Sequence, residues 1–216
     1  MNKTAGKYFA IGDIHGCMGM LEALWDSLDF NRETDTLVFV GDYIDRGPDS
    51  KEVVDFVLDL QSTVKCICLL GNHEQMLLTY FLHNSYKEFY LMNGGTSTVA
   101  SYGLINSDAG KKINIPPGHL DFFRNLIHYY ETEDYIFVHA GLKPGVPLAK
   151  QDPTDLIWIR EEFIGTETDF GKKVVFGHTP LPRPLISPNK IGIDTGAVYG
   201  GKLTCIKLPD EIIYQV

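Results

Sequence analysis

Five short polar clusters stand out in the sequence, because each follows an apolar run and combines a small residue with Asp, Asn or His. They are Gly12-Asp13-Ile14-His15-Gly16, Gly41-Asp42-Tyr43-Ile44-Asp45-Arg46-Gly47, Gly71-Asn72-His73-Glu74, His139-Ala140-Gly141 and Gly177-His178-Thr179. Small residues let a backbone approach a ligand closely. An ordinary turn explains any one cluster, but unrelated turns do not explain five, and we therefore expect a shared functional site.

Side chains from these clusters form a set that suits divalent metal ions. The set comprises Asp13, His15, Asp42, Asn72, His139 and His178. Two carboxylates, three imidazoles and one amide oxygen are hard-to-borderline ligands, which suit Mn, Fe or Zn better than soft metals. They exceed the ligands that one tetrahedral zinc ion needs. We therefore expect two divalent ions, with one carboxylate bridging them.

Strands interleaved with helices are expected to position these side chains. Apolar runs at residues 7–11, 36–40 and 64–70 predict strands that each stop at a glycine, and residues 135–138 and 174–176 predict later strands. Helical spacing of apolar residues follows at 18–28 and 53–58, and residues 202–208 and 211–215 predict a closing hairpin. Ligands gather at the carboxyl ends of strands in α/β sheets, where the polar clusters fall.

Length and composition set further bounds. The chain has 216 residues and 44% hydrophobic residues, which predicts a single domain over residues 1–216 with an ordinary core. The formal net charge of −9 disfavours nucleic acid as a partner. No apolar run is long enough for a membrane span, and the N-terminus lacks an apolar leader segment, so we expect no membrane partner and a cytoplasmic protein. The scattered cysteines indicate neither disulfides nor a zinc site, and the oligomeric state stays open.

The motifs resemble the signature of the phosphoprotein phosphatase family of serine/threonine phosphatases, within the calcineurin-like metallophosphoesterases. They span residues 12–179, and Asp194-Thr195-Gly196-Ala197 is also similar to the family. His139-Ala140-Gly141 and the C-terminal stretch resemble bacterial and phage members more than eukaryotic ones. The resemblance implies a four-layer α/β sandwich. Two mixed β-sheets would be flanked by helices, with a dinuclear metal site at the C-terminal ends of strands.

The resemblance also implies a role for each motif residue. Asp13 and His15 would hold the first ion, Asp42 would bridge both ions, and the second ion would be held by Asn72, His139 and His178. His73 would be the general acid, with Asp45 accepting its other ring N–H. Arg46 would bind the substrate phosphate, and Arg160 is the candidate for a second phosphate-binding arginine. Asn93 and Tyr199 are further candidates for substrate contact, and Mn²⁺ is the usual activator in the family.

These roles agree with elementary phosphoryl-transfer chemistry. Two bound ions lower the pKa of a bridging water, so that hydroxide is available near neutral pH. Guanidinium groups match the charged phosphoryl oxygens, and a histidine oriented by a carboxylate can protonate the leaving oxygen. We therefore expect hydrolysis of phosphomonoesters by direct attack of a metal-bridging hydroxide, without a phosphoenzyme.

Two substrates stay open. Asp45 and Glu74 favour a serine/threonine protein phosphatase acting on a phosphorylated protein or peptide. The alternative is a diadenosine tetraphosphate hydrolase acting on dinucleotide polyphosphates, with which Cys17 and Gly47-Pro48-Asp49-Ser50 are shared. A catalytically silent binding module is a remote alternative, because all the ligands and His73 are present. Residues from about 84 to 133 are a possible substrate-cap insertion that would decide selectivity.

Overall fold

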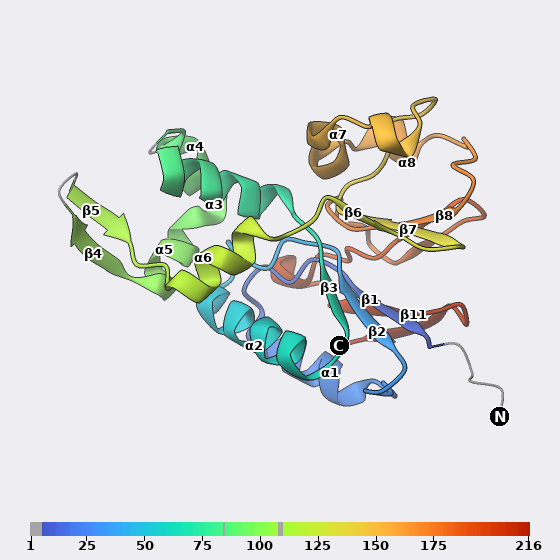
Figure 1. The fold of residues 1–216 in the computed structure, drawn as a ribbon, viewed down its shortest axis with the longest axis horizontal. Coiled ribbons are helices and arrows are strands. Elements are labelled where there is room, and N and C mark those ends of the chain that lie inside the picture. The colour runs from blue at the N-terminus through green and yellow to red at the C-terminus, as the bar shows by residue number, and fades with distance from the viewer. Residues whose placement is uncertain (1–5, 84, 108–109) are drawn as a thin grey trace.

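A computed structural model describes residues 6–83, 85–107 and 110–216 of the chain. Residues 1–5 at the N-terminus, where no apolar leader segment is expected, lie outside the described residues. Residue 84 and residues 108–109 of the expected cap also lie outside them. Two five-stranded sheets lie face to face, and helices cover the outer face of each (Figure 1). Within the described chain, no helix has the length and apolar character needed to cross a membrane.

The first sheet has the strand order β12-β11-β1-β2-β3. Its parallel part consists of β1 (Tyr8–Ile11), β2 (Thr36–Phe39) and β3 (Cys66–Cys68). The strands β11 (Thr204–Leu208) and β12 (Ile212–Gln215) form the expected closing hairpin, which joins β1 antiparallel. The sheet is therefore mixed, with its parallel strands at the side that carries the N-terminal motifs.

The second sheet has the order β6-β7-β8-β10-β9 and is mixed as well. Strands β7 (Tyr135–Val138), β8 (Lys173–Phe176) and β10 (Lys190–Gly192) are parallel. The edge strands β6 (Tyr129–Glu131) and β9 (Leu185–Ile186) pair antiparallel. The short strands β6, β9 and β10 lack a clear apolar alternation, and the sequence pattern does not predict them.

Helices cover the two outer faces. The first sheet is covered by α1 (Met18–Ser27), α2 (Ser50–Thr63), α3 (Asn72–His83) and α6 (Pro117–Arg124). The second is covered by α7 (Pro153–Trp158) and α8 (Glu161–Ile164), and short 3-10 turns occur at η2 (Leu148–Lys150) and η3 (Ala197–Tyr199). Alternate residues of β1 show the layering, because Phe9 and Ile11 face the helices whereas Ala10 faces the other sheet. The expected four-layer α/β sandwich is confirmed.

The segment between α3 and α6 forms a separate projection from the first sheet. It contains α4 (Lys87–Tyr90), the π-helical turn η1 (Leu91–Gly95), α5 (Thr96–Tyr102) and a hairpin of β4 (Leu104–Ser107) with β5 (Gly110–Ile113). The hairpin extends away from the two sheets, whereas α4 lies beside α3 (Figure 1). Only the α4–α5 part of this segment therefore approaches the site described below.

Candidate active site

The predicted metal ligands all follow parallel strands, and the structure brings them to one place. Asp13 and His15 follow β1, Asp42 follows β2, Asn72 begins α3 after β3, and the last two, His139 and His178, follow β7 and β8. Each of the six side chains is buried, with no more than 4% of its surface exposed. The carboxyl ends of the parallel strands of both sheets thus meet at one buried polar site, as the strand pattern predicts.

Several site residues have a left-handed backbone, which side chains other than glycine rarely adopt. The φ angles of His15, Asp42, Asp45, Arg46 and His178 lie between +48° and +72°. Such conformations cost about 1–3 kcal/mol each and cluster at functional sites. Gly71 and Gly177 are required for a different reason, because a side chain would have no room there. A Cβ on Gly71 would lie 2.2 Å from Asp42 Oδ1, and one on Gly177 would lie 2.1 Å from Asp13 Oδ1.

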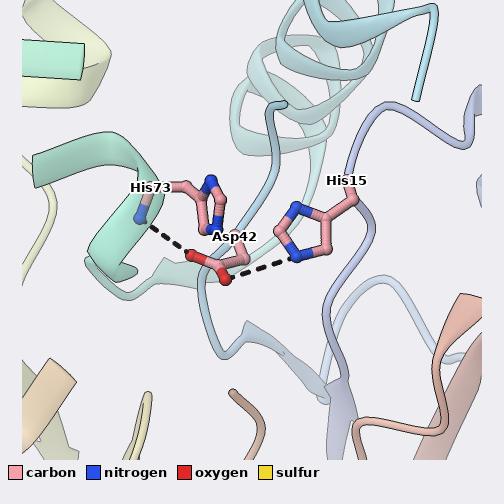
Figure 2. Close-up of side chains that lie close together, drawn as sticks. All are labelled: His15, Asp42 and His73. Carbon is pink, nitrogen blue, oxygen red and sulfur yellow. Dashed lines mark hydrogen bonds and ion pairs between the residues drawn. The ribbon is translucent and has the colours of Figure 1, made fainter. Parts of the chain in front are cut away.

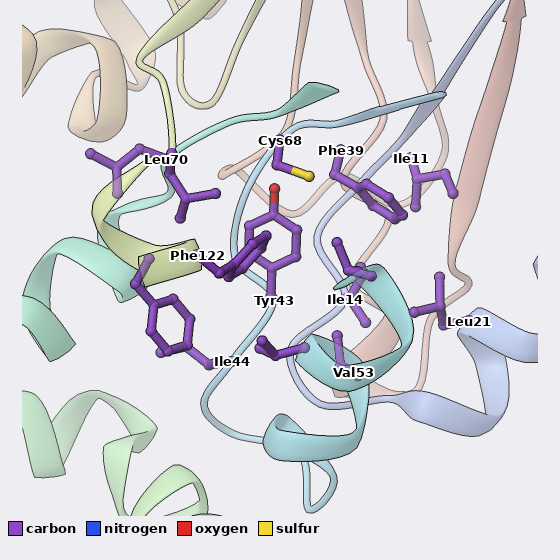
Figure 3. Packing of buried hydrophobic residues seen from close by; sticks show 14 of the residues in the cluster. Ile11, Ile14, Leu21, Phe39, Tyr43, Ile44, Val53, Cys68, Leu70 and Phe122 are labelled. Atoms are coloured by element: carbon purple, nitrogen blue, oxygen red, sulfur yellow. The ribbon is translucent and has the colours of Figure 1, made fainter. Parts of the chain in front are cut away.

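The loop after β2 carries Asp42, and its apolar residues anchor it in the core. Tyr43 and Ile44 are fully buried, and Figure 3 shows them packed among Phe39, Val53 and Phe122. The Tyr43 hydroxyl donates to the carbonyl of Leu69, 3.1 Å away. Tyr43 is therefore a core residue that holds the loop and does not line the cleft.

One group of potential metal ligands consists of His15, Asp42 and His73, whose ligand atoms lie within 4.8 Å of one another. The Nε2 atom of His15 lies 3.4 Å from Asp42 Oδ2, and the backbone N–H of His73 donates to Asp42 Oδ1 at 3.2 Å (Figure 2). The guanidinium of Arg46 contacts the same Nε2 atom of His15. A positive group thus already lies against this ligand set.

A second group consists of Asp42, His139 and His178. The Nε2 atom of His139 lies 3.5 Å from Asp42 Oδ1 and 3.0 Å from Asn72 Oδ1. The Nδ1 atom of His178 lies 3.0 Å from the same amide oxygen. Asp42 belongs to both groups, as expected of a bridging carboxylate.

The tautomers of two histidines show that this site fits cations. The Nδ1–H of His15 donates to the carbonyl of Ile44 (2.8 Å), and that of His139 donates to the carbonyl of Val40 (2.9 Å). Burial lowers the pKa of His15 to about 3 and also lowers the pKa of His139, so both rings are neutral and Nε2 carries a lone pair. The lone pair of His139 faces Asp42 Oδ1 and Asn72 Oδ1, which also accept, whereas that of His15 faces both Asp42 Oδ2 and the donor Arg46. A divalent metal ion held by His139, Asp42 and Asn72 would resolve this apposition of acceptors.

Two further observations support the same fit. The Nε2 atom of His178 is buried and has no hydrogen-bond partner among the described residues, and such orphaned atoms are rare in native proteins. Burial disfavours the charge of Asp42, but the surrounding imidazoles, with that of His139 foremost, hold its pKa well below the usual range. The site therefore presents a carboxylate and free imidazole lone pairs, the donor set of a divalent metal centre.

Asp13 lies in the site but in a different arrangement from the other ligands. Both its carboxylate oxygens accept the backbone N–H of His178, at 3.2 and 3.0 Å. Burial, followed by the charges of Asp194 and Asp42, raises the pKa of Asp13. Its expected role as a ligand of the first ion stays a prediction. The neighbouring Asp194 is also buried, and burial raises its pKa to about 6.

His73 and Asp45 form a buried dyad beside the ligands. The ring Nδ1 of His73 lies 2.7 Å from Asp45 Oδ2, and the two side chains are 1% and 0% exposed. The other oxygen of Asp45 accepts hydrogen bonds from the hydroxyls of Tyr90 (2.8 Å) and Thr98 (2.5 Å). A carboxylate that is held on both sides fixes the tautomer and direction of the histidine ring, as a general acid requires.

The candidate substrate-binding residues lie at the rim. The Arg46 guanidinium lies over the ring of Tyr199 at 5.4 Å, and Tyr199 is 62% exposed. Arg160 precedes α8 and donates to the hydroxyl of Thr179 at 3.4 Å. The amide of Asn93 donates to the carbonyl of Phe89, so it stabilises its own helical turn. A substrate contact by each of these residues stays a prediction.

Four residues of the site have no assigned role in the sequence analysis. The Glu74 carboxylate accepts the backbone N–H groups of Asp42, Tyr43, Ile44 and Gly71 at 2.9–3.3 Å. Tyr90 and Thr98 bind Asp45, and Asp194 lies beside Asp13. Glu74 and Asp194 belong to recognisable motifs and could have been found, whereas Tyr90 and Thr98 lie in helices without a motif.

Comparisons with known proteins identify a family and several relatives of this chain. The model of a family described as calcineurin-like phosphoesterase matches residues 6–207. The asymmetrical bis(5'-nucleosyl)-tetraphosphatase PrpE of Oceanobacillus iheyensis is 29% identical over 95% of this chain and 90% of its own. PrpE of Bacillus cereus (strain AH187) is 33% identical over 97% of this chain and 94% of its own.

Solved structures agree with this result. A structure described as that of a candidate diadenosine tetraphosphatase has a TM-score of 0.76 at 26% identity, and the match covers 100% of this chain and 95% of that one. A serine/threonine phosphatase from Saccharomyces cerevisiae has a TM-score of 0.64 at 15% identity, covering 97% and 79%. The latter likeness concerns the fold alone.

The fold and the buried ligand cluster define a metal-dependent phosphoesterase. The chain belongs to the calcineurin-like phosphoesterase family. The family expectation is thereby confirmed at this level, while the two sequence relatives named above are described as tetraphosphatases.

Proposed function

We propose that this protein hydrolyses dinucleoside polyphosphates, with diadenosine tetraphosphate as a representative substrate. The observation that supports this proposal is the similarity to the PrpE tetraphosphatases, which extends over 94–97% of the chain at 29–33% identity. Asymmetrical cleavage adds water across one phosphoanhydride bond and releases a nucleoside triphosphate and a nucleoside monophosphate. The proposal replaces the protein phosphatase that Asp45 and Glu74 favoured.

The structure explains why Asp45 and Glu74 are poor guides to the substrate. Glu74 is fully buried and its carboxylate faces four backbone N–H groups. Asp45 is also fully buried and faces His73, Tyr90 and Thr98. Glu74 positions the backbone of the Asp42 loop, and Asp45 positions the His73 ring, both from the buried side of the site. Neither contacts the space in which a substrate would lie, so they serve a phosphopeptide and a dinucleotide equally well.

The proposed metal sites rest on the ligand groups described above. Asp42 would belong to both sites, with His15 and Asp13 on one side and Asn72, His139 and His178 on the other. When bound, two divalent ions would lower the pKa of a water molecule and offset the negative charge of the phosphates. Mn²⁺ is the first ion to test, and Fe and Zn suit the same ligands.

The chain's own residues would bind the phosphates and supply a proton. Arg46 and Arg160 carry guanidinium groups beside the ligand cluster, and planar guanidinium groups match phosphate oxygens with two parallel hydrogen bonds. His73 would protonate the oxygen of the leaving phosphate through Nε2, because Asp45 engages its Nδ1. A leaving phosphate is a weaker base than an alkoxide, so a dinucleotide should depend less on this proton than a phosphoserine does.

A paired rate measurement tests the proposal. Purified protein loaded with Mn²⁺ is given diadenosine tetraphosphate or a phosphoserine/phosphothreonine peptide, and kcat/KM is compared. We expect at least a tenfold preference for the dinucleotide, with ATP and AMP as products. The variant Asp42→Asn, which removes the charge shared by both ligand groups, is the inactive control. A tenfold preference for the peptide would reject the proposal, and ADP as the sole product would reject the asymmetrical cleavage.

A further inference from the structure

An aromatic hollow lies next to the candidate active site and has no part in the chemistry described so far. It has a volume of about 190 Å³ and is lined by Gln75, Met76 and Thr79 of α3, Tyr86, Phe89 and Tyr90 in and before α4, and Trp158 at the end of α7. None of these lining side chains carries a charge. The hollow is thus a small, largely aromatic space between α3 and α4 on one side and α7, which is distant in the sequence, on the other.

Two contacts place the hollow at the edge of the metal cluster. The ring of Trp158 meets the ring of His178 edge to face, with centroids 6.0 Å apart. The hydroxyl of Tyr90 donates to Asp45 at 2.8 Å, and Asp45 in turn holds His73. A ligand in the hollow would therefore be separated from His178 by the Trp158 ring and from the His73–Asp45 dyad by the Tyr90 ring, a separation that a phosphate chain can span.

The exposure of its walls indicates that the hollow is built for a flat partner. Tyr86 is 72% exposed and Phe89 is 51% exposed, so two large rings face solvent beside a polar site. Exposed aromatic clusters of this kind are typical of binding surfaces. Aromatic side chains offer stacking faces to nucleobases, and this stacking adds substantially to affinity.

Gln75 supplies a polar group at the hollow. Its Oε1 accepts the indole N–H of Trp158 at 3.3 Å. Within the described part of the chain, its amide NH₂ has no hydrogen-bond partner, so both of its hydrogens remain available. A purine offers ring-nitrogen acceptors at the edge of a flat aromatic system, and the NH₂ group of Gln75 can donate to such an acceptor.

We propose that this hollow binds one purine base of the dinucleotide substrate. The inference rests on the proposed function, because it needs a substrate with a base joined to the hydrolysed phosphates. A peptide backbone would find few partners on these walls, whereas a base needs stacking faces and one donor. The aromatic ring of a phosphotyrosine is the competing occupant, and the experiment includes it.

The kinetic test removes one wall of the hollow. In Phe89→Ala, kcat/KM for diadenosine tetraphosphate divided by kcat/KM for p-nitrophenyl phosphate should fall about 10- to 100-fold, the range of a lost base–aromatic stack. The matched control is Met92→Ala, on the following turn, because Met92 is 87% exposed and does not line the hollow. A phosphotyrosine peptide that loses as much activity as the dinucleotide would overturn the assignment to a base.

A binding measurement separates this inference from the proposed function. The chain has two tryptophans, and Trp25 packs against Phe30 in a different region, so Trp25→Phe leaves Trp158 as the only reporter. Adenosine should quench Trp158 fluorescence, and Phe89→Ala should abolish the quenching. Quenching without dinucleotide hydrolysis would reject the function and retain the base site. Dinucleotide hydrolysis with no quenching at millimolar adenosine, and an unchanged ratio in Phe89→Ala, would retain the function and reject the base site.

Discussion

Glu74 provides a sharp test of how the site is assembled, because its charge can be removed with almost no change of shape. Its Oε2 accepts the N–H groups of Asp42 (3.0 Å) and Gly71 (3.1 Å), and its Oε1 accepts those of Tyr43 (2.9 Å) and Ile44 (3.3 Å). Burial, with the charges of Asp42 and Asp45, raises the pKa of Glu74. A protonated Glu74 would nevertheless point its O–H at a donor, since both oxygens face N–H groups.

The magnitude of Glu74→Gln follows from this count of donors. A glutamine keeps one oxygen, which can satisfy Tyr43 and Ile44, and it turns its NH₂ towards the N–H groups of Asp42 and Gly71. Leaving a buried donor unsatisfied costs about 1–3 kcal/mol. Two such donors predict a loss of about 2–6 kcal/mol in the free energy of unfolding. If Glu74 were a neutral acid, glutamine would replace it with little cost.

Urea unfolding of the metal-free protein measures this loss directly. Chelator is present because a bound ligand stabilises the folded state and would confuse the comparison. The midpoint of Glu74→Gln should fall by about 1–2 M urea. Glu22→Gln, at an exposed position of α1, is the matched control and should leave the midpoint unchanged. A loss below about 1 kcal/mol in Glu74→Gln would refute the ionised, four-donor account.

The remaining predictions concern the acid, the phosphate ligand and the second sheet. His73→Asn should lower kcat for an alkyl phosphate by about 10²–10⁴ and lower it much less for p-nitrophenyl phosphate; an equal loss on both would show that His73 is not the proton donor. Arg160→Ala should raise KM for the dinucleotide while kcat changes little, and an unchanged KM would exclude Arg160 as a phosphate ligand. Lys190 is 2% exposed and donates to the carbonyls of Phe163 (2.6 Å), Ile164 (3.0 Å) and Thr166 (2.5 Å). Lys190→Met should therefore lower the free energy of unfolding by about 2–4 kcal/mol, and chemical denaturation with no change in midpoint would contradict this.

Much of the fold could be predicted from the sequence because the buried strands carry strong apolar runs. The runs at 7–11, 36–40, 135–138 and 174–176 all contain observed strands, and the closing hairpin pairs as expected. The run at 64–70 overestimates β3, which is confined to Cys66–Cys68, because Val64 caps the end of α2. The edge strands and the π-helical turn η1 depend on tertiary packing, and their local sequence carries little sign of it.

The ligand cluster could be predicted for a different physical reason. A motif that follows a parallel strand lies at a known edge of the sheet, so sequence position is enough to bring Asp42, Asn72 and His139 together. The partners of the dyad have no such rule. Tyr90 and Thr98 reach Asp45 from helices that pack on α3 and α2, and the contact depends on how that projection is docked. The expected cap segment thus contributes to the interior of the site.

Substrate choice was the hardest feature to predict, because the motif residues face either the ligand cluster or the backbone. The segment from α4 to η1 both lines the aromatic hollow and contacts residues of the candidate active site. Tyr90 lines the aromatic hollow and also holds Asp45, and the carbonyl of Gly94 accepts the backbone N–H of Arg46 at 3.1 Å. A Cβ on Gly94 would lie 2.7 Å from the Arg46 side chain, so this contact depends on glycine. A base that binds in the hollow would therefore contact the same segment that positions Asp45 and Arg46. Substitutions of Tyr90 or Gly94 should consequently change selectivity and turnover together, whereas substitutions of Asp42, Asn72 or His139 should mainly lower turnover.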